Sequence, residues 1–211
     1  MRNAKLSSAI PFCKVCFRDI GPRGVHPLVK AVPGICHSCY SALNPRFRHW
    51  RFKGVPFLSI FDYTEGMQSL LFQFKGCFDI ELAPLFLEYP LPLLKAKYRG
   101  YCLVPAPSSD SHNQRRGFNH VVEAFSSLGL PILPLLKKTS DRKQTDCTVD
   151  QRREVGKIIA LTKPLSLKGK KILFVDDVFT TGSTALACLK LIASCRPKKV
   201  AGLVLSKTLP K

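Results

Sequence analysis

Two adjacent carboxylates and a hydroxyl-rich turn stand together in the last third of the chain. Asp176 and Asp177 follow an apolar run, residues 172–175, and an apolar-periodic segment begins after Thr184. The run predicts a short buried strand and the segment predicts a helix. Free N–H groups at a helix N-terminus bind phosphate, whereas carboxylates suit sugar hydroxyls or a divalent cation. The pattern predicts a phosphorylated-sugar site, although an ordinary acidic loop between a strand and a helix has the same outline.

Four cysteines near the N-terminus form two pairs with metal-ligand spacing. The pairs are Cys13-x-x-Cys16 and Cys36-x-x-Cys39, with 19 residues between them. Two such pairs can close a tetrahedral zinc site with no open position, which is typical of a structural ion. Two redox pairs, or four unrelated cysteines, are the alternatives. A segment of this length has little core of its own, so zinc would supply much of its folding free energy.

Charge is the most unusual feature of the composition. The 211 residues carry a formal net charge of +19, and residues 1–53 hold ten basic residues against one acidic residue. Such a surface attracts polyanions, including nucleic acid, although a generally basic protein would look the same. The chain has no apolar run long enough to span a bilayer and no signal-peptide pattern, so we expect a cytoplasmic protein without a membrane span.

Strands and helices alternate along the rest of the chain. Strands are expected at 57–63, 101–104, 132–136, 172–175 and 200–206, and helices at 65–75, 113–128 and from 184 onward. This order predicts an α/β fold with a parallel sheet covered on both faces and a ligand site beyond the carboxyl ends of the strands. The expected organisation is a four-cysteine zinc module at 1–45, a basic linker at 46–56 and the sheet domain at 57–211.

The acidic stretch resembles the characteristic motif of type I phosphoribosyltransferases, which use 5-phosphoribosyl-1-pyrophosphate (PRPP). The resemblance implies that Asp176 and Asp177 hold the ribose hydroxyls. It also implies a loop for the 5′-phosphate, made of Phe179, Thr180, Thr181, Gly182, Ser183 and Thr184. Enzymes of this group that act on purines carry an aspartate where Thr180 stands, so the motif is more similar to that of the orotate type.

Several separated motifs resemble, in order, the ComF family, which includes the GntX-type proteins. They are the four cysteines, Phe74-Lys75-Gly76 with Asp79, Val104-Pro105-Ala106-Pro107-Ser108, Arg115-Arg116-Gly117-Phe118-Asn119 and Arg152-Arg153. The resemblance implies a type I phosphoribosyltransferase-like fold with an N-terminal zinc module. It implies that the loop from Val104 to Ser108 meets the pyrophosphate. Arg115 and Arg116 would add charge there, although a solvated helix start would carry the same arginines.

The family comparison implies an enzyme that transfers phosphoribosyl from PRPP, with Mg²⁺, to an unknown acceptor. Its candidate catalytic residues are Asp176, Asp177, Arg115 and Arg116. It also implies a role in DNA uptake during natural competence, with single-stranded DNA and a helicase-like protein as partners. A non-catalytic PRPP sensor or nucleic-acid-binding module is the alternative. One departure stands beside the arginines, because His120 replaces the glutamine that usually follows Arg-Gly-Phe-Asn.

Overall fold

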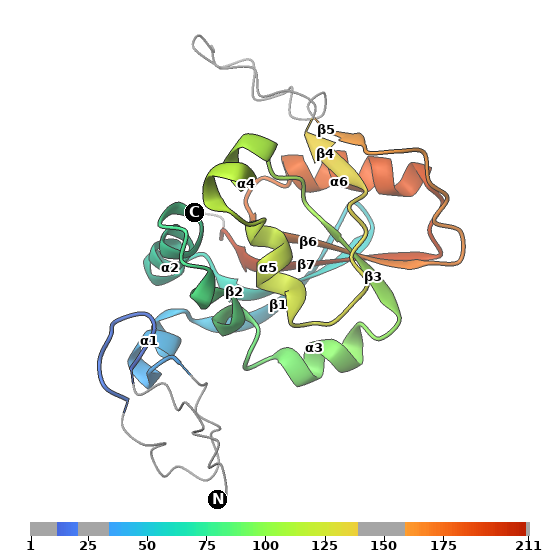
Figure 1. Ribbon diagram of the computed structural model, residues 1–211. Helices are drawn as coiled ribbons and strands as arrows, with labels where there is room; N and C mark the ends of the chain where they lie inside the picture. The colour runs from blue at the N-terminus through green and yellow to red at the C-terminus, as the bar shows by residue number, and fades with distance from the viewer. Residues whose placement is uncertain (1–11, 21–33, 139–158, 210–211) are drawn as a thin grey trace, which may run out of the picture.

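A five-stranded sheet forms the centre of the molecule (Figure 1). The structure is a computed structural model that describes residues 12–20, 34–138 and 159–209. The strand order is β1-β2-β7-β6-β3, and only β1 runs antiparallel to its neighbour. The strands are β1 (Pro45–Phe52), β2 (Val55–Asp62), β3 (Tyr101–Pro105), β6 (Lys171–Phe179) and β7 (Lys199–Lys207).

Helices cover both faces of this sheet, as the sequence predicted (Figure 1). One face packs against α2 (Glu65–Gly76), the 3₁₀ helix η1 (Ile80–Phe86), α3 (Leu91–Lys97) and α5 (His120–Ser126). The other face packs against α6 (Ser183–Ser194) and a two-stranded ribbon of β4 (Leu136–Lys138) and β5 (Ile159–Leu161). Two short helices, α1 (His37–Ala42) and α4 (Asp110–Arg116), complete the described elements.

Alternation along β6 divides the core into two clusters. Leu173 and Val175 belong to the cluster under α2 and α5, and Ile172 and Phe174 belong to the cluster under α6. All four side chains have no exposed surface. Successive side chains of a strand point to opposite faces, so a continuous apolar run is what a strand buried on both sides requires. The expected α/β class is therefore confirmed.

The interpretation of residues 46–56 as a linker is wrong. Most of this segment is β1, which forms a hairpin with β2 through Lys53 and Gly54 at φ of 50° and 82°. Positive φ at both central residues is typical of the tight turn that joins two antiparallel strands. Aromatic side chains of β1 turn inward while most of its basic ones stay exposed. The alternation of aromatic and basic residues in β1 was not recognised in the sequence because the segment contains so many arginines.

One arginine of the hairpin is held by an ion pair. Arg48 donates two hydrogen bonds to Asp62 at the end of β2, at 2.5 and 2.8 Å. Asp62 is 3% exposed, and the hydrogen bonds from Arg48 hold its pKa below the usual range. The charge of Arg48 is therefore paired within the fold. Arg46, Arg51 and Lys53 are the other exposed cations at this edge of the sheet.

The helix expected at 113–128 is two helices. Gly117 ends α4 with a left-handed φ of 81°, and Asn119 caps α5 by accepting hydrogen bonds from the N–H groups of Val121 and Val122. The strand expected at 132–136 is also displaced, since Ile132 makes only an isolated bridge to Leu103 and β4 begins at Leu136. The break at Gly117 turns the chain so that the end of α4 and the start of α5 face the same pocket.

The described part of the cysteine module shares its core with the sheet. Cys13, Ile35 and Leu43 are 0%, 4% and 2% exposed, and they belong to the cluster that contains α2 and η1. Lys14 also forms an ion pair of 3.0 Å with Glu81. The division of the chain into two domains stays a prediction. No helix in the described part of the chain has the length and hydropathy that crossing a bilayer requires.

Candidate functional site

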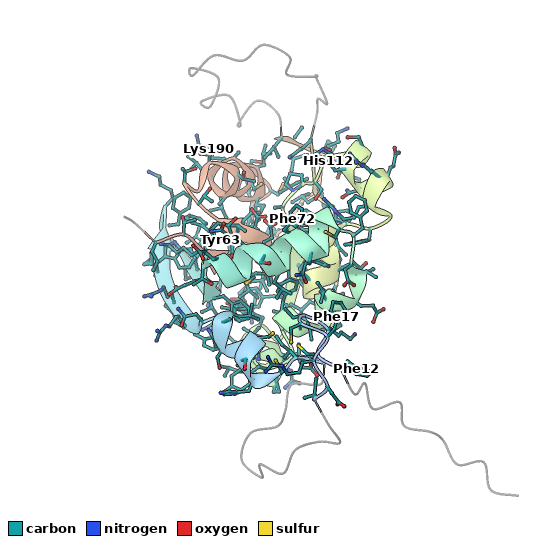
Figure 2. The ribbon with its side chains drawn as sticks, turned by 90° about the vertical axis from the view of Figure 1, so that its left-hand side faces the viewer. Phe12, Phe17, Tyr63, Phe72, His112 and Lys190 are labelled. Carbon is teal, nitrogen blue, oxygen red and sulfur yellow. The ribbon has the colours of Figure 1, made fainter. Side chains whose placement is uncertain are left out.

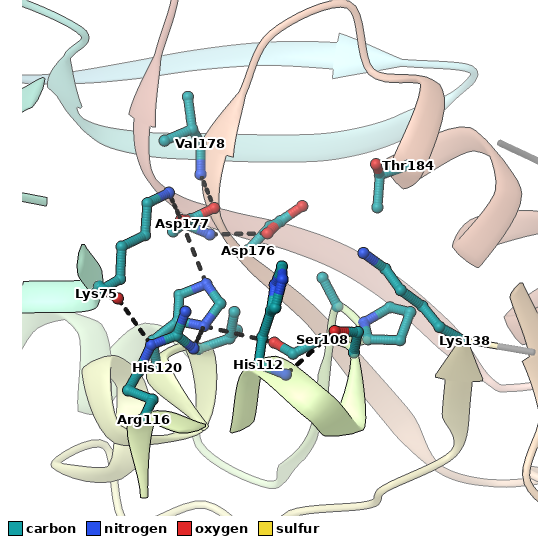
Figure 3. Close-up of a pocket in the computed structure, with 14 residues that line it drawn as sticks. Lys75, Ser108, His112, Arg116, His120, Lys138, Asp176, Asp177, Val178 and Thr184 are labelled. Carbon is teal, nitrogen blue, oxygen red and sulfur yellow. Dashed lines mark hydrogen bonds and ion pairs between the residues drawn. The ribbon is translucent and has the colours of Figure 1, made fainter. Parts of the chain in front are cut away.

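A pocket of about 240 Å³ lies at the carboxyl ends of β3 and β6 (Figure 3). Parallel strands end at the same edge of a sheet, and ligands of such sheets bind there. The pocket brings together carboxylates, cations and hydroxyls from distant parts of the chain. It is lined by Lys75, Ala106, Pro107, Ser108, Ser109, His112, Arg116, His120, Val121, Lys138, Asp176, Asp177, Val178 and Thr184.

The acidic pair lies within β6 and not in a loop after it. Asp176 is paired with Val204 of β7 in the parallel ladder, and Val178 is paired with Ser206. The two carboxylates therefore leave the strand on opposite faces. Asp177 points toward α2 and α5, where it meets side chains of both helices, and Asp176 lies on the face that α6 covers. The pair reaches the pocket from both sides of the sheet.

Asp177 is held by two basic side chains. Lys75 Nζ lies 2.6 Å from Asp177 Oδ2, and His120 Nε2 lies 3.4 Å from the same oxygen (Figure 3). Burial would raise the pKa of Asp177, but the hydrogen bond from His120 and the charge of Lys75 outweigh burial and lower that pKa below its usual range. Asp177 is therefore an ionised hydrogen-bond acceptor at neutral pH.

Asp176 has the opposite environment. Burial, and then the negative charge of Asp177, raise the pKa of Asp176 well above its usual range. One stabilising contact opposes this, because the backbone N–H of Asp177 donates a 2.9 Å hydrogen bond to Asp176 Oδ1. Two adjacent carboxyls whose environments push their pKa values apart are a common feature of functional sites.

The hydroxyl-rich turn leads from β6 into the N-terminus of α6. Thr181 and Ser183 are exposed and share a 2.9 Å hydrogen bond between their hydroxyls. Gly182 has a φ of 79°, and a Cβ there would lie 2.7 Å from ring atoms of both Phe179 and Phe52. Glycine is required by the conformation and by these two rings. The turn thus rests on aromatic packing and presents its polar groups outward.

Three comparisons with known proteins place the chain. The phosphoribosyl transferase domain model matches residues 114–208. The chain is 30% identical over 147 residues to competence protein ComFC of Streptococcus pneumoniae, which covers 70% of the chain. It is 29% identical over 136 residues to competence protein ComFC of Bacillus subtilis, which covers 62% of the chain. The chain spans 66% and 56% of the length of these two relatives.

The chain belongs to the ComF family of phosphoribosyltransferase-like proteins. Solved structures with similarity include a hypoxanthine-guanine phosphoribosyltransferase of Bacillus anthracis, at 15% identity and a TM-score of 0.41, covering 61% of this chain and 70% of that one. A purine phosphoribosyltransferase of Pyrococcus horikoshii matches at 16% identity and a TM-score of 0.37, covering 60% and 72%.

The structure of this ComF-family chain brings some of the predicted site residues together and leaves others outside. Ala106, Pro107, Ser108, Asp176, Asp177, Arg116 and Thr184 line the pocket. Arg115 is exposed outside it, and Val104, Pro105 and Phe179 are buried. Thr180, Thr181, Gly182 and Ser183 form the turn beside it. Arg152 and Arg153 lie outside the described residues.

Two cations that line the pocket, Lys75 and Lys138, were not among the predicted site residues. Lys75 comes from the last turn of α2 and reaches Asp177, and Lys138 comes from β4 and extends toward the gap between Asp176 and Thr184 (Figure 3). The Phe-Lys-Gly motif was the available signal for Lys75. Lys138 stands in a generally basic segment, and no pattern in that segment distinguishes it from Lys137.

The four cysteines gather into one cluster. Phe12 and Phe17, which are the sequence neighbours of Cys13 and Cys16, lie on the other side of α2 from His112 (Figure 2). The sulfur atoms of the four cysteines all lie within 4.8 Å of one another, and Cys16 Sγ is 3.8 Å from Cys36 Sγ. A tetrahedral ion with metal–sulfur bonds of about 2.3 Å requires sulfur separations of about 3.8 Å. The cluster therefore fits a metal ion of tetrahedral preference.

Backbone groups support this cluster electrostatically. The N–H of Cys36 donates to Cys13 Sγ at 3.3 Å, and the N–H of Cys39 donates to Cys36 Sγ at 3.5 Å. Burial would raise the pKa of Cys13, but backbone N–H donors, that of Cys36 first, lower it to about 6. Burial and the neighbouring sulfurs raise the pKa of Cys39. One thiolate thus forms readily, and a cation would displace the remaining protons.

Proposed function

We propose that this chain binds PRPP in the pocket at the ends of β3 and β6 and transfers its phosphoribosyl group to an acceptor. The observation that carries the proposal is the convergence of an acidic pair, a helix N-terminus and three cations on one pocket. Asp176 and Asp177 suit the ribose hydroxyls, and the turn before α6 suits the 5′-phosphate. Arg116 and Lys138 suit the pyrophosphate.

The chain's own residues would act by positioning and by charge. Displacement at ribose C1 builds positive charge on the sugar and negative charge on the departing pyrophosphate. Fixed cations near the leaving group and fixed carboxylates near the ribose stabilise these charges without reorganising. Mg²⁺ would neutralise part of the pyrophosphate charge, because it prefers oxygen ligands and bridges phosphates. Asp176, which is partly exposed in the pocket, is the residue best suited to approach it.

The four-cysteine cluster is proposed to hold structural Zn²⁺. Four sulfur ligands leave no position for a substrate, and zinc is the common divalent ion that takes four thiolates. We also propose that the protein is cytosolic, because thiols stay reduced in the cytosol and remain available to the metal. The names of the relatives support a role in competence, which would associate the protein with DNA uptake and with a helicase-like partner.

Lys138 offers a direct test of the pocket. Replacing Lys138 with glutamine is expected to weaken PRPP binding about 10-fold, because one charge-assisted contact to a phosphate oxygen is lost. The matched control is Lys137→Gln, since Lys137 is the adjacent exposed residue of β4, points to the other face and does not line the pocket. Calorimetric titration with PRPP and Mg²⁺ measures both. Equal losses of PRPP affinity in the two variants would show that Lys138 acts only through the general positive charge of this segment and does not contact the ligand.

A second candidate, a nucleic-acid-binding module, is favoured by the exposed cations of the β1–β2 hairpin. Arg46, Arg51 and Lys53 are exposed on this edge of the sheet, away from the pocket. Their joint replacement by glutamine is expected to weaken single-stranded DNA binding and to lower its salt dependence by about two to three ion equivalents. Fluorescence anisotropy between low and moderate salt measures both quantities. An unchanged salt slope would remove the hairpin from any DNA-binding surface.

A further inference from the structure

Four residues from four elements form a closed ring of contacts at the pocket (Figure 3). Asp177 of β6 meets Lys75 of α2 at 2.6 Å and His120 of α5 at 3.4 Å. Arg116 Nη1 of α4 lies 3.0 Å from His120 Nδ1, and Arg116 Nε donates to the backbone oxygen of Lys75 at 2.9 Å. The ring ties the carboxylate on one side of the pocket to the guanidinium on the other.

The chemistry of the partners fixes the protonation state of His120. An arginine side chain has five N–H donors and no acceptor, so Nδ1 must offer its lone pair to Arg116. Ser108 Oγ, at 3.4 Å from Nδ1, can donate to the same atom. Asp177 is ionised and only accepts, so the facing Nε2 must carry the proton. A neutral imidazole with its proton on Nε2 satisfies both neighbours at once.

The ring also orients Arg116. Two of its nitrogens, Nε and Nη1, are engaged within the ring. Among the described residues Nη2 has no such contact, so it is available to an anionic oxygen in the pocket. Arg116 is partly buried, and its guanidinium carbon lies 5.9 Å from the centre of the Phe118 ring, which further restricts the guanidinium plane. An arginine that is held this way binds an anion with little loss of side-chain freedom.

We propose that His120 is a positioning residue for the phosphoribosyl substrate. Its two ring nitrogens hold Arg116, on the pyrophosphate side, in a fixed relation to Asp177, on the ribose side. This inference rests on the proposed function, because it assigns a role within the same pocket. It predicts that the ring contributes more to the affinity for PRPP, which contacts both Arg116 and Asp177, than to the affinity for pyrophosphate, which contacts only Arg116.

The proposal is tested by replacing His120 with residues that keep or lose its two hydrogen bonds. His120→Gln keeps an acceptor for Arg116 and a donor for Asp177, whereas His120→Leu keeps the volume and loses both. We expect His120→Leu to lose about 10- to 100-fold in PRPP affinity and about 10-fold or less in affinity for pyrophosphate alone. His120→Gln is expected to stay within about 3-fold of the wild type for both probes.

A measurement on the unsubstituted protein keeps the proposal testable if His120→Leu unfolds. Long-range ¹⁵N–¹H NMR of the free wild-type chain at neutral pH should show His120 with a protonated Nε2 and an unprotonated Nδ1. A proton on Nδ1, alone or together with Nε2, overturns the inference. So does a folded His120→Leu variant that binds PRPP as tightly as the wild type.

The two proposals fail in different ways. If the wild type binds neither PRPP nor pyrophosphate, the proposed function is wrong, and the positioning role falls with it even where NMR finds the expected tautomer. If the wild type binds PRPP and His120→Leu binds it equally well, only the positioning role is wrong. Thermal unfolding of the free variants separates a lost contact from a lost fold.

Discussion

Removing the metal from the four-cysteine site is expected to destabilise the whole chain and not only its N-terminal part. Cys13 has no exposed surface and belongs to the same apolar cluster as α2 and η1. Structural zinc contributes free energy of folding on the order of 10 kcal/mol in small zinc-dependent peptides. Even a third of that amount would lower the thermal midpoint by about 10 °C in a domain of this size.

The double variant Cys16→Ser, Cys39→Ser tests this with the least disturbance of packing. Cys16 is exposed and Cys39 is partly exposed, so serine at these positions removes ligands without opening a cavity in the core. We expect one zinc per chain in the wild type by mass spectrometry of the metal content. The double variant should hold none, and its unfolding midpoint should fall by about 10 °C or more.

The control for this prediction is Cys77→Ser. Cys77 is an exposed cysteine at the end of α2, and it is not part of the cluster. Its replacement should change neither the metal content nor the midpoint by more than a degree or two, as is usual for an exposed position. A wild-type chain that contains one zinc, yet unfolds at the same temperature as the metal-free double variant, would contradict the structural role.

Local patterns in the sequence were sufficient for much of this fold. The apolar run at 172–175 and the periodic segment after Thr184 became the centre of β6 and the length of α6. Both rest on short-range physics, because a strand buried on both faces needs consecutive apolar residues and an amphipathic helix needs its 3.6-residue period. The pairing of Cys13 and Cys16 with Cys36 and Cys39 was predictable for the same reason, since ligand spacing is local.

The contacts that define the pocket could not be predicted from local sequence patterns. Lys75 and Asp177 meet because α2 and β6 pack together, and nothing in either segment specifies the other. The position of Asp176 and Asp177 inside β6, which sends them to opposite faces, depends on pairing with β7. The hairpin at β1 was missed because its apolar alternation is interleaved with arginine, whose long side chains belong on the exposed edge of a sheet.

Replacing Asp176 with asparagine is expected to weaken PRPP binding while making the free protein more stable. A hydrogen bond from a ribose hydroxyl to a carboxylate contributes about 1.5–3 kcal/mol, which corresponds to about 10- to 100-fold in affinity. Replacing Asp177 in addition should bring the loss to about 100-fold or more. Calorimetric titration with PRPP and Mg²⁺ measures each variant. The control is Asp110→Asn, because Asp110 is an exposed carboxylate of α4 that does not line the pocket.

The gain in stability follows from the raised pKa of Asp176, whose main causes are burial and the charge of Asp177. The unfolded chain loses this proton near pH 3.9, and the folded chain loses it at a higher pH. Between these two values the folded state binds more protons, so the free energy of unfolding of the wild type falls as pH rises. Asparagine cannot ionise and does not show this fall. The variant should therefore be more stable at neutral pH, and its advantage should vanish as the pH drops below about 4.

Measuring both stability and PRPP affinity distinguishes a structural role of Asp176 from a role in ligand binding. A residue that is retained for the fold should lower stability when it is replaced, whereas a residue that is strained by its neighbours and needed by a ligand should do the reverse. Chemical unfolding at pH 4 and pH 7, followed for the wild type and Asp176→Asn, measures the sign. A variant that is less stable than the wild type at pH 7 would show that Asp176 supports the strand. A variant that is more stable yet binds PRPP normally would remove Asp176 from the ribose site and leave Asp177 as the only carboxylate ligand of the pair.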